Sequence, residues 1–117
     1  MADYREISQQ YAQGAIKAVI LVNSGALIAS LSQLDSVLKL VSSGTYATSA
    51  TFWLLGTVLG ITSWMLAFFS TRNVDRTERG ENTSYLAANF WMHATELAWF
   101  LSLGAFCYGG YVLIGAI

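Results

Sequence analysis

Hydrophobic positions along this chain form three long stretches without charge, and each is about as long as a bilayer is thick. The stretches cover residues 18–34, 40–71 and 97–117. A helix rises 1.5 Å per residue, so about 20 helical residues cross the roughly 30 Å hydrocarbon core. The pattern therefore predicts an all-α integral membrane protein, a three-helix bundle in which residues 1–117 form a single transmembrane domain.

Spacing and turn residues set the expected limits of the three helices. We expect the first helix over about 4–41, because leucines recur there at intervals of three and four up to Val41. A turn at 42–45 follows, where Gly44 is expected in the left-handed conformation and Ser or Thr caps the next helix. The second helix is expected over about 46–70, a polar loop over 71–84 and the third helix over about 84–117.

The distribution of Lys and Arg predicts the orientation in the membrane. The expected cytoplasmic side holds Arg5, Lys17, Arg72, Arg76 and Arg79, whereas the other side holds only Lys39. The positive-inside rule then places the N-terminus and the polar loop in the cytoplasm and the C-terminus outside. We expect the protein in a bacterial inner (cytoplasmic) membrane.

Composition supports a membrane protein and restricts its partners. Hydrophobic residues make up 55% of the chain and charged residues 11%, against about 25% charged in a typical soluble domain. The net charge is -1, which argues against nucleic acid as a partner. The single cysteine, Cys107, excludes an intrachain disulfide.

Small residues recur in a row along each expected helix. Such residues drive association in lipid, because they let two backbones approach closely and gain van der Waals contact. Two interpretations stay open: the rows pack against one another within one chain, or at least one row faces another subunit. The candidate interface residues are Gly25 and Ala29 on the first helix, Gly56 and Gly60 (a G-x-x-x-G) on the second, and Ala98, Ser102, Ala105 and Gly109 on the third.

Three polar residues near or within the spans are candidates for a site. His93 and Glu96 share a helix face at i,i+3. They either lie at the membrane interface, or lie deeper as weak candidates for contacting a cofactor such as quinone or haem. Asn23 lies within the first span and needs a hydrogen-bond partner there, so we expect it to pack helices together more than to bind a ligand.

The sequence contains no nucleophile–base constellation, phosphate loop or zinc spacing, so no catalytic residue, metal or cofactor is expected, and haem or quinone would need a partner subunit. The leading hypothesis is a non-enzymatic accessory subunit that associates laterally with a larger membrane complex or with itself. Helix count and topology are similar to those of three-helix accessory subunits of respiratory or photosynthetic complexes. The alternatives are a holin-like pore-forming homo-oligomer and a quinone or haem anchor of a respiratory oxidoreductase. In each case lipid and other membrane subunits are the expected partners.

Overall fold

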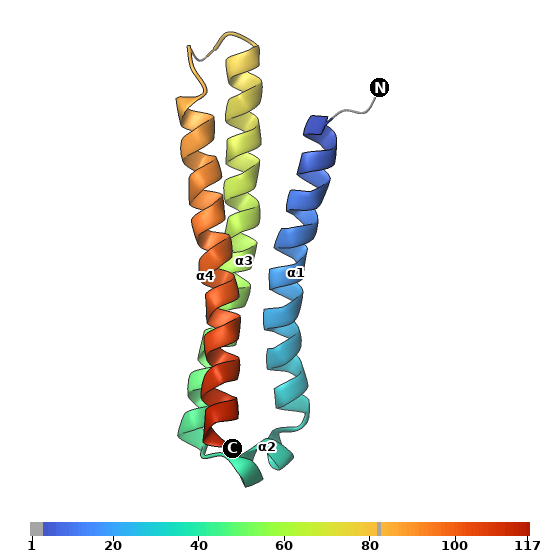
Figure 1. The fold of residues 1–117 in the computed structure, drawn as a ribbon, viewed down its shortest axis with the longest axis vertical. Coiled ribbons are helices and arrows are strands. Elements are labelled where there is room, and N and C mark those ends of the chain that lie inside the picture. The colour runs from blue at the N-terminus through green and yellow to red at the C-terminus, as the bar shows by residue number, and fades with distance from the viewer. Residues whose placement is uncertain (1–3, 82) are drawn as a thin grey trace.

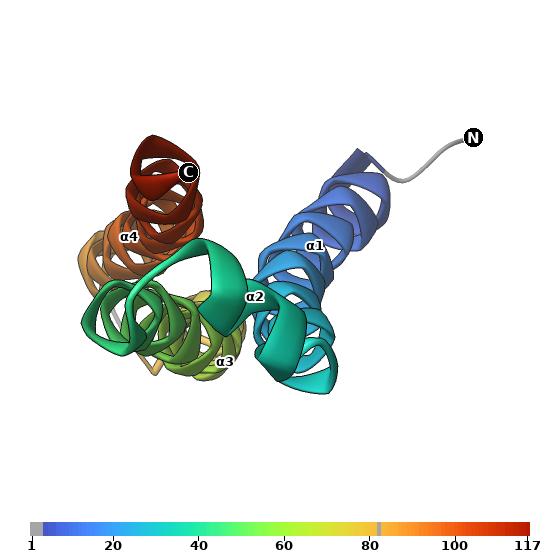
Figure 2. The ribbon, with the colours of Figure 1, turned by 90° about the horizontal axis from the view of Figure 1, so that it is seen from below.

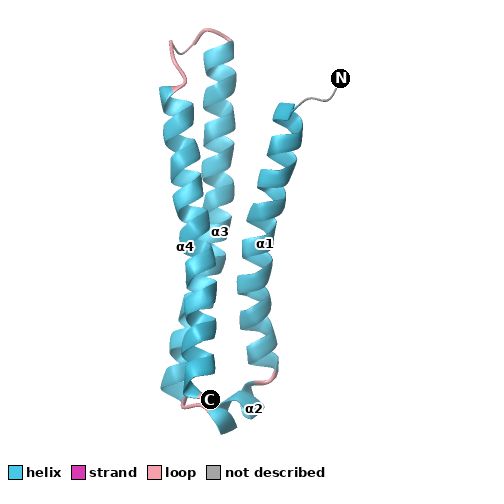
Figure 3. Ribbon diagram, in the orientation of Figure 1, coloured by secondary structure: helices cyan, strands magenta, loops and turns pink. Residues whose placement is uncertain are grey.

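Four helices make up the computed structural model, which describes residues 4–81 and 83–117 (Figures 1 and 3). They are α1 (Tyr4–Ser32), α2 (Leu34–Leu40), α3 (Ser43–Glu78) and α4 (Leu86–Ala116). Three of them, α1, α3 and α4, are long and apolar enough to cross a membrane. The predicted all-helical class with three membrane-length helices is therefore confirmed.

The three long helices lie side by side in an elongated bundle measuring 60 × 28 × 19 Å. Helices α3 and α4 run antiparallel and pair along their length, whereas α1 leans away from both toward its N-terminus (Figures 1 and 2). The chain direction places the start of α1 and the α3–α4 connection at one end. The short α2 and the C-terminus lie at the other end (Figure 1).

The prediction of one continuous helix over 4–41 is wrong, because the helix breaks at Gln33 between α1 and α2. The backbone there has φ -115° and ψ 28°, and its N–H bonds to Ser30 with the spacing of a tighter turn. The hydroxyls of Ser30 and Ser32 donate to carbonyls three residues earlier, at 3.0 and 2.8 Å. Serine hydroxyls that bond back to the preceding turn bend helices, which explains a break at this position.

The break directs α2 across the end of the bundle, where two of its apolar residues contact α3. Leu34 and Val37 pack against a buried cluster of Val41, Tyr46 and Trp53. The Tyr46 hydroxyl also forms a 2.8 Å hydrogen bond with Ser30 Oγ. Leu34 and Val37 of the amphipathic end expected from the sequence are thus half-buried against α3 of the same chain, whereas Leu31 and Leu38 are exposed.

Helix α3 begins earlier and ends later than the predicted 46–70. Ser42 caps it by accepting a hydrogen bond from the backbone N–H of Thr45 at 3.1 Å, while Gly44 is helical and not left-handed as expected. The helix continues through residues 71–78 of the predicted 71–84 loop and ends at Glu78, two residues before Gly80, which has φ +84°. There the N–H groups of Gly80 and Glu81 donate to the carbonyls of Thr77 and Arg76, as in a Schellman motif.

Polarity alone does not end a helix, which is why the loop prediction failed over residues 71–78. Asp75 and Arg79 form an i,i+4 ion pair at 3.0 Å, and Asn73 donates to the carbonyl of Phe69 at 2.8 Å. The chain contains no proline. A positive φ at Gly80 therefore stops α3 about two turns after the apolar residues end. Helix α4 agrees with the predicted 84–117 to within two residues at each end.

Candidate functional site

The three long helices meet at a buried polar junction formed by Asn23, Gly56 and Ser102. Asn23 and Ser102 are fully buried, with 0% exposure. Asn23 Nδ2 donates to Val19 O at 2.8 Å in its own helix and to Ser102 O and Oγ across the bundle at 3.2 and 3.3 Å. Ser102 Oγ in turn donates to Gly56 O at 2.6 Å. One chain of hydrogen bonds therefore joins α1, α4 and α3.

Glycine at position 56 makes this junction sterically feasible. A Cβ at Gly56 would overlap the side-chain amide of Asn23. Oδ1 of Asn23 has no hydrogen-bond partner among the described residues, and it lies where that Cβ would be. An α-hydrogen of Gly56 therefore points at Oδ1, in the arrangement of a weak Cα–H···O contact. Asn23 thus serves helix packing through both of its polar atoms.

The second glycine of the G-x-x-x-G motif faces the same neighbour. A Cβ at Gly60 would lie 2.7 Å from Ile20 Cγ1 and 3.4 Å from Val19 Cγ2. Gly56 and Gly60 are both buried. The row on α3 therefore packs against α1 of the same chain.

The row on α4 is buried against α3 and α1. Its members Ala98, Ser102, Ala105 and Gly109 are all buried. A Cβ at Gly109 would lie 2.7 Å from Trp53 Nε1 and 3.1 Å from Ser49 O. Small residues here let α4 approach the backbone of α3 directly.

The row on α1 faces outward. Gly25 and Ala29 are exposed, and a Cβ at Gly25 would meet nothing within 4 Å. Ala18 and Gly14 continue the same exposed face two and three turns from Gly25 toward the N-terminus, and Gly14 also has open space around its Cα. We call Gly14, Ala18, Gly25 and Ala29 the α1 outer row. Gly14 was not among the predicted interface residues, although its spacing of four residues from Ala18 fits the same row.

His93 and Glu96 lie on the outside of the bundle, with side-chain exposures of 71% and 56%. His93 Nδ1 is 3.6 Å from Glu96 Oε2. Glu96 also borders a surface cleft between α1 and α4 that Ala12, Trp99 and Phe100 help to line. The pair is brought together as its spacing predicts, and it faces away from the polar junction.

Because Glu96 is exposed, Glu96→Gln should change the free energy of unfolding by less than about 0.5 kcal/mol. The measurement is thermal unfolding of the purified protein in a mild detergent, followed by circular dichroism. His93→Gln is the matched variant, because it removes the other member of the pair. A loss of several kcal/mol for Glu96→Gln would contradict the exposed position of this carboxylate.

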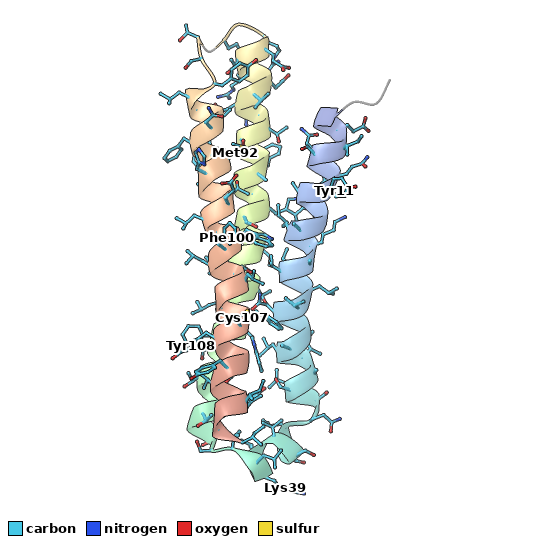
Figure 4. The ribbon with its side chains drawn as sticks, viewed as in Figure 1. Tyr11, Lys39, Met92, Phe100, Cys107 and Tyr108 are labelled. Carbon is cyan, nitrogen blue, oxygen red and sulfur yellow. The ribbon has the colours of Figure 1, made fainter. Side chains whose placement is uncertain are left out.

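The arginines expected to set topology gather near the end of α3. Arg79 pairs with Asp75 and lies 4.0 Å from Glu81, and Arg76 lies 3.9 Å from Glu81. Arg72 is exposed one turn earlier. Lys39, on α2, lies at the opposite end of the molecule (Figure 4). The fold therefore separates these arginines from Lys39 by the length of the bundle.

Two buried or half-buried tryptophans link helices through their indole N–H groups, and Trp99 is the first of them. Its Nε1 donates to Ala15 O at 2.9 Å and so ties α4 to α1. The corresponding atom of Trp53 donates to Phe106 O at 3.3 Å and ties α3 to α4. An indole N–H within an apolar span needs an acceptor, and this was the available sequence signal.

Ligand chemistry is sparse in the described part of the chain. Among residues 4–81 and 83–117 there is no group of three or more His, Cys, Asp or Glu side chains arranged to hold a metal ion. Cys107 is exposed on α4. Two features stand out among the described residues. The polar junction joins three helices by buried hydrogen bonds, and the α1 outer row is a set of small residues exposed on the outside of the bundle.

Comparison with protein-family models, with curated protein sequences and with solved structures gave no match.

Proposed function

We propose that this protein is a non-enzymatic membrane subunit that works by lateral association, and that the α1 outer row is its contact surface. The partner is a larger membrane complex or another copy of the chain, in a bacterial inner membrane with the N-terminus in the cytoplasm. The single observation that carries the proposal is the exposure of this row, while the rows on α3 and α4 are buried within the chain.

Glycine in the outer row has no role in internal packing. Gly56, Gly60 and Gly109 each have a neighbour within 3 Å of the position of a Cβ, whereas Gly14 and Gly25 have none within 4 Å. A glycine within a helix is less favourable than alanine by about 1 kcal/mol. An external helix that packs closely on α1 would make use of Gly14 and Gly25, as the buried rows do within the bundle.

The apolar surface around the row supports contact with membrane partners or lipid. Large side chains beside it are exposed, including Leu21 at 71% and Ile28 at 66%. Between Gly14 and Ser32 the one charged residue of α1 is Lys17, which is exposed and directs its Nζ over the ring of Trp64 on α3, 5.9 Å from the ring centroid. A helix could therefore approach this face without burying an unpaired charge.

Leucine at both Gly25 and Ala29 should block close approach and weaken association at least about tenfold, or about 1.4 kcal/mol. The fold should survive, because these positions have no internal neighbour to displace. The measurement is native mass spectrometry of the tagged protein extracted gently from its own membrane, comparing parent and variant.

Gly104→Leu is the matched control. Gly104 is exposed on α4 with open space around it. It also lies at the depth of Gly25, because Asn23 bonds to Ser102 two residues earlier in each helix. A complex that survives Gly25→Leu/Ala29→Leu, or that is lost equally in Gly104→Leu, would contradict the role of the outer row. If native mass spectrometry shows a ring of identical chains, the holin-like pore-forming homo-oligomer becomes the favoured function.

A further inference from the structure

The divergence of α1 opens a cleft against α3 near the end of the bundle that carries the arginines. The cleft has a volume of about 240 Å³. It is lined from α1 by Gln9, Ala12, Gln13 and Ile16, and from α3 by Trp64, Ala67, Phe68 and Thr71. We call it the α1–α3 cleft. None of these residues takes part in the polar junction or the outer row.

The lining of the cleft changes from apolar to polar along the helix axis. Ile16 and Trp64 lie at its inner end, toward the polar junction, while Gln9 and Thr71 lie at its outer end. A second, shallow groove formed by Ile61, Trp64, Met65 and Phe68 continues from the inner end along the outside of α3. Since the two share Trp64 and Phe68, the apolar groove adjoins the inner part of the cleft, and the polar residues of the cleft lie farther out.

The depth of the cleft matches the headgroup region of a bilayer. Gly56 lies at the middle of the uncharged stretch 40–71. At 1.5 Å per residue, Trp64 lies about 12 Å and Thr71 about 22 Å from Gly56 along α3. Half of the hydrocarbon core is about 15 Å and half of the whole bilayer about 20–22 Å. The outer end of the cleft therefore falls at the level of glycerol and phosphate, and its inner end and the groove fall at the level of acyl chains.

The cations nearest the cleft are Lys17 and Arg72, while the carboxylate of Asp75, one turn beyond Thr71 on α3, is paired with Arg79. Lys17 Nζ lies over the ring of Trp64, on the wall of the cleft. Arg72 follows Thr71 on α3 and is exposed. Neither cation forms an ion pair with any residue that the structure describes. The lining itself contains no carboxylate, and on α1 the nearest is Glu6, about one turn beyond Gln9.

We propose that the α1–α3 cleft binds one anionic phospholipid. Its phosphate would lie at the outer end of the cleft near Arg72, with Gln9 and Gln13 as hydrogen-bond donors and the Lys17 ammonium facing it from the inner end, and one acyl chain would follow the groove along Trp64 and Phe68. An amphipathic ligand with negative charge fits because polar and apolar walls are continuous and the unpaired charges are cations. The proposal does not rest on the α1 outer row, which occupies the other side of α1.

Tryptophan quenching by brominated lipid tests the site in the full-length protein. The protein is reconstituted in phosphatidylcholine vesicles that contain a minor fraction of either phosphatidylglycerol or phosphatidylcholine brominated on its acyl chains. Anionic lipid should be enriched about fivefold at the site for the one lysine charge. Brominated phosphatidylglycerol should therefore quench more strongly than brominated phosphatidylcholine, and the excess should disappear in Trp64→Phe.

Lys17→Gln should remove most of the excess quenching, whereas Lys39→Gln is the matched control at the far end of the molecule (Figure 4). Circular dichroism checks that each variant is folded. Equal quenching by the two brominated lipids in the parent protein would overturn the proposal, even if a variant failed to fold. Equal loss in Lys17→Gln and Lys39→Gln would overturn it as well, because the effect would then be one of overall charge.

Discussion

Gly56→Ala is expected to destabilise the folded bundle by about 1–3 kcal/mol, the usual range for overpacking a close contact. The added methyl group would occupy the space of the Asn23 side-chain amide. Asn23 is fully buried, so its side chain can move only by giving up the hydrogen bonds to Ser102. The substitution therefore combines a steric clash with the loss of the link between α1 and α4.

The measurement is thermal unfolding in a mild detergent, followed by circular dichroism, with Gly104→Ala as control. That substitution is chemically the same and lies at a similar depth, but its Cβ meets nothing within 4 Å. It should leave stability unchanged or raise it slightly, since alanine favours helix. If Gly56→Ala and Gly104→Ala unfold alike, Gly56 is not a close-contact position.

Asn23→Ala adds a second test of the same contact. Alone it should lower stability by about 0.5–1.5 kcal/mol through the lost interhelical hydrogen bonds. Combined with Gly56→Ala it should be less harmful than the sum of the two, with a coupling of at least about 0.5 kcal/mol. Additive effects would mean that the methyl group at position 56 and the Asn23 side chain do not compete for one space.

Gly109→Ala is expected to loosen the pairing of α3 and α4 and to destabilise the protein by about 1–3 kcal/mol. Its methyl group would lie 2.7 Å from Trp53 Nε1 and 3.1 Å from the backbone oxygen of Ser49. Trp53 is only 5% exposed and its indole N–H is bonded to Phe106 O, so the ring has little room to move. The backbone of Ser49 cannot move without shifting α3.

The adjacent residue provides the control for Gly109. A Cβ at Gly110 would meet nothing within 4 Å. Gly110→Ala should therefore unfold at or slightly above the temperature of the parent, while Gly109→Ala unfolds at a lower one. Tryptophan emission during the melt includes the signal of Trp53, one of the four tryptophans of the chain. Equal unfolding temperatures for the two variants would contradict the close approach of α4 to α3.

Much of the fold could be predicted because a bilayer imposes length and polarity on each span. The uncharged stretches 18–34, 40–71 and 97–117 were sufficient to place three helices. The predictions of helix boundaries failed at the ends of the apolar stretches, where the bilayer no longer sets length or polarity. At Gln33 serine hydroxyls and the packing of α2 decide the break, and over 71–78 hydrogen bonds and an ion pair extend α3 in the absence of a helix breaker.

Less of the candidate site was predictable, because small residues look alike wherever they occur. Gly56 and Gly25 both stand in a row of small residues in an apolar helix, yet Gly56 lies against Asn23 and Gly25 against nothing. In lipid the residues around a packed row and an unpacked row are equally apolar, so hydrophobicity does not separate them. The α1–α3 cleft could not be predicted from the sequence either, because it depends on the angle between α1 and α3.

The sequence by itself determined the solvent, the number of spans and the residues able to pack closely, because burying backbone in lipid requires helices of a set length. Only the tertiary structure decided how those residues are used. It paired α3 with α4, joined Asn23 to Ser102 over Gly56, and left the α1 outer row exposed. The physical reason is that close packing depends on the relative position of helices in space, and a linear pattern of small residues does not specify that position.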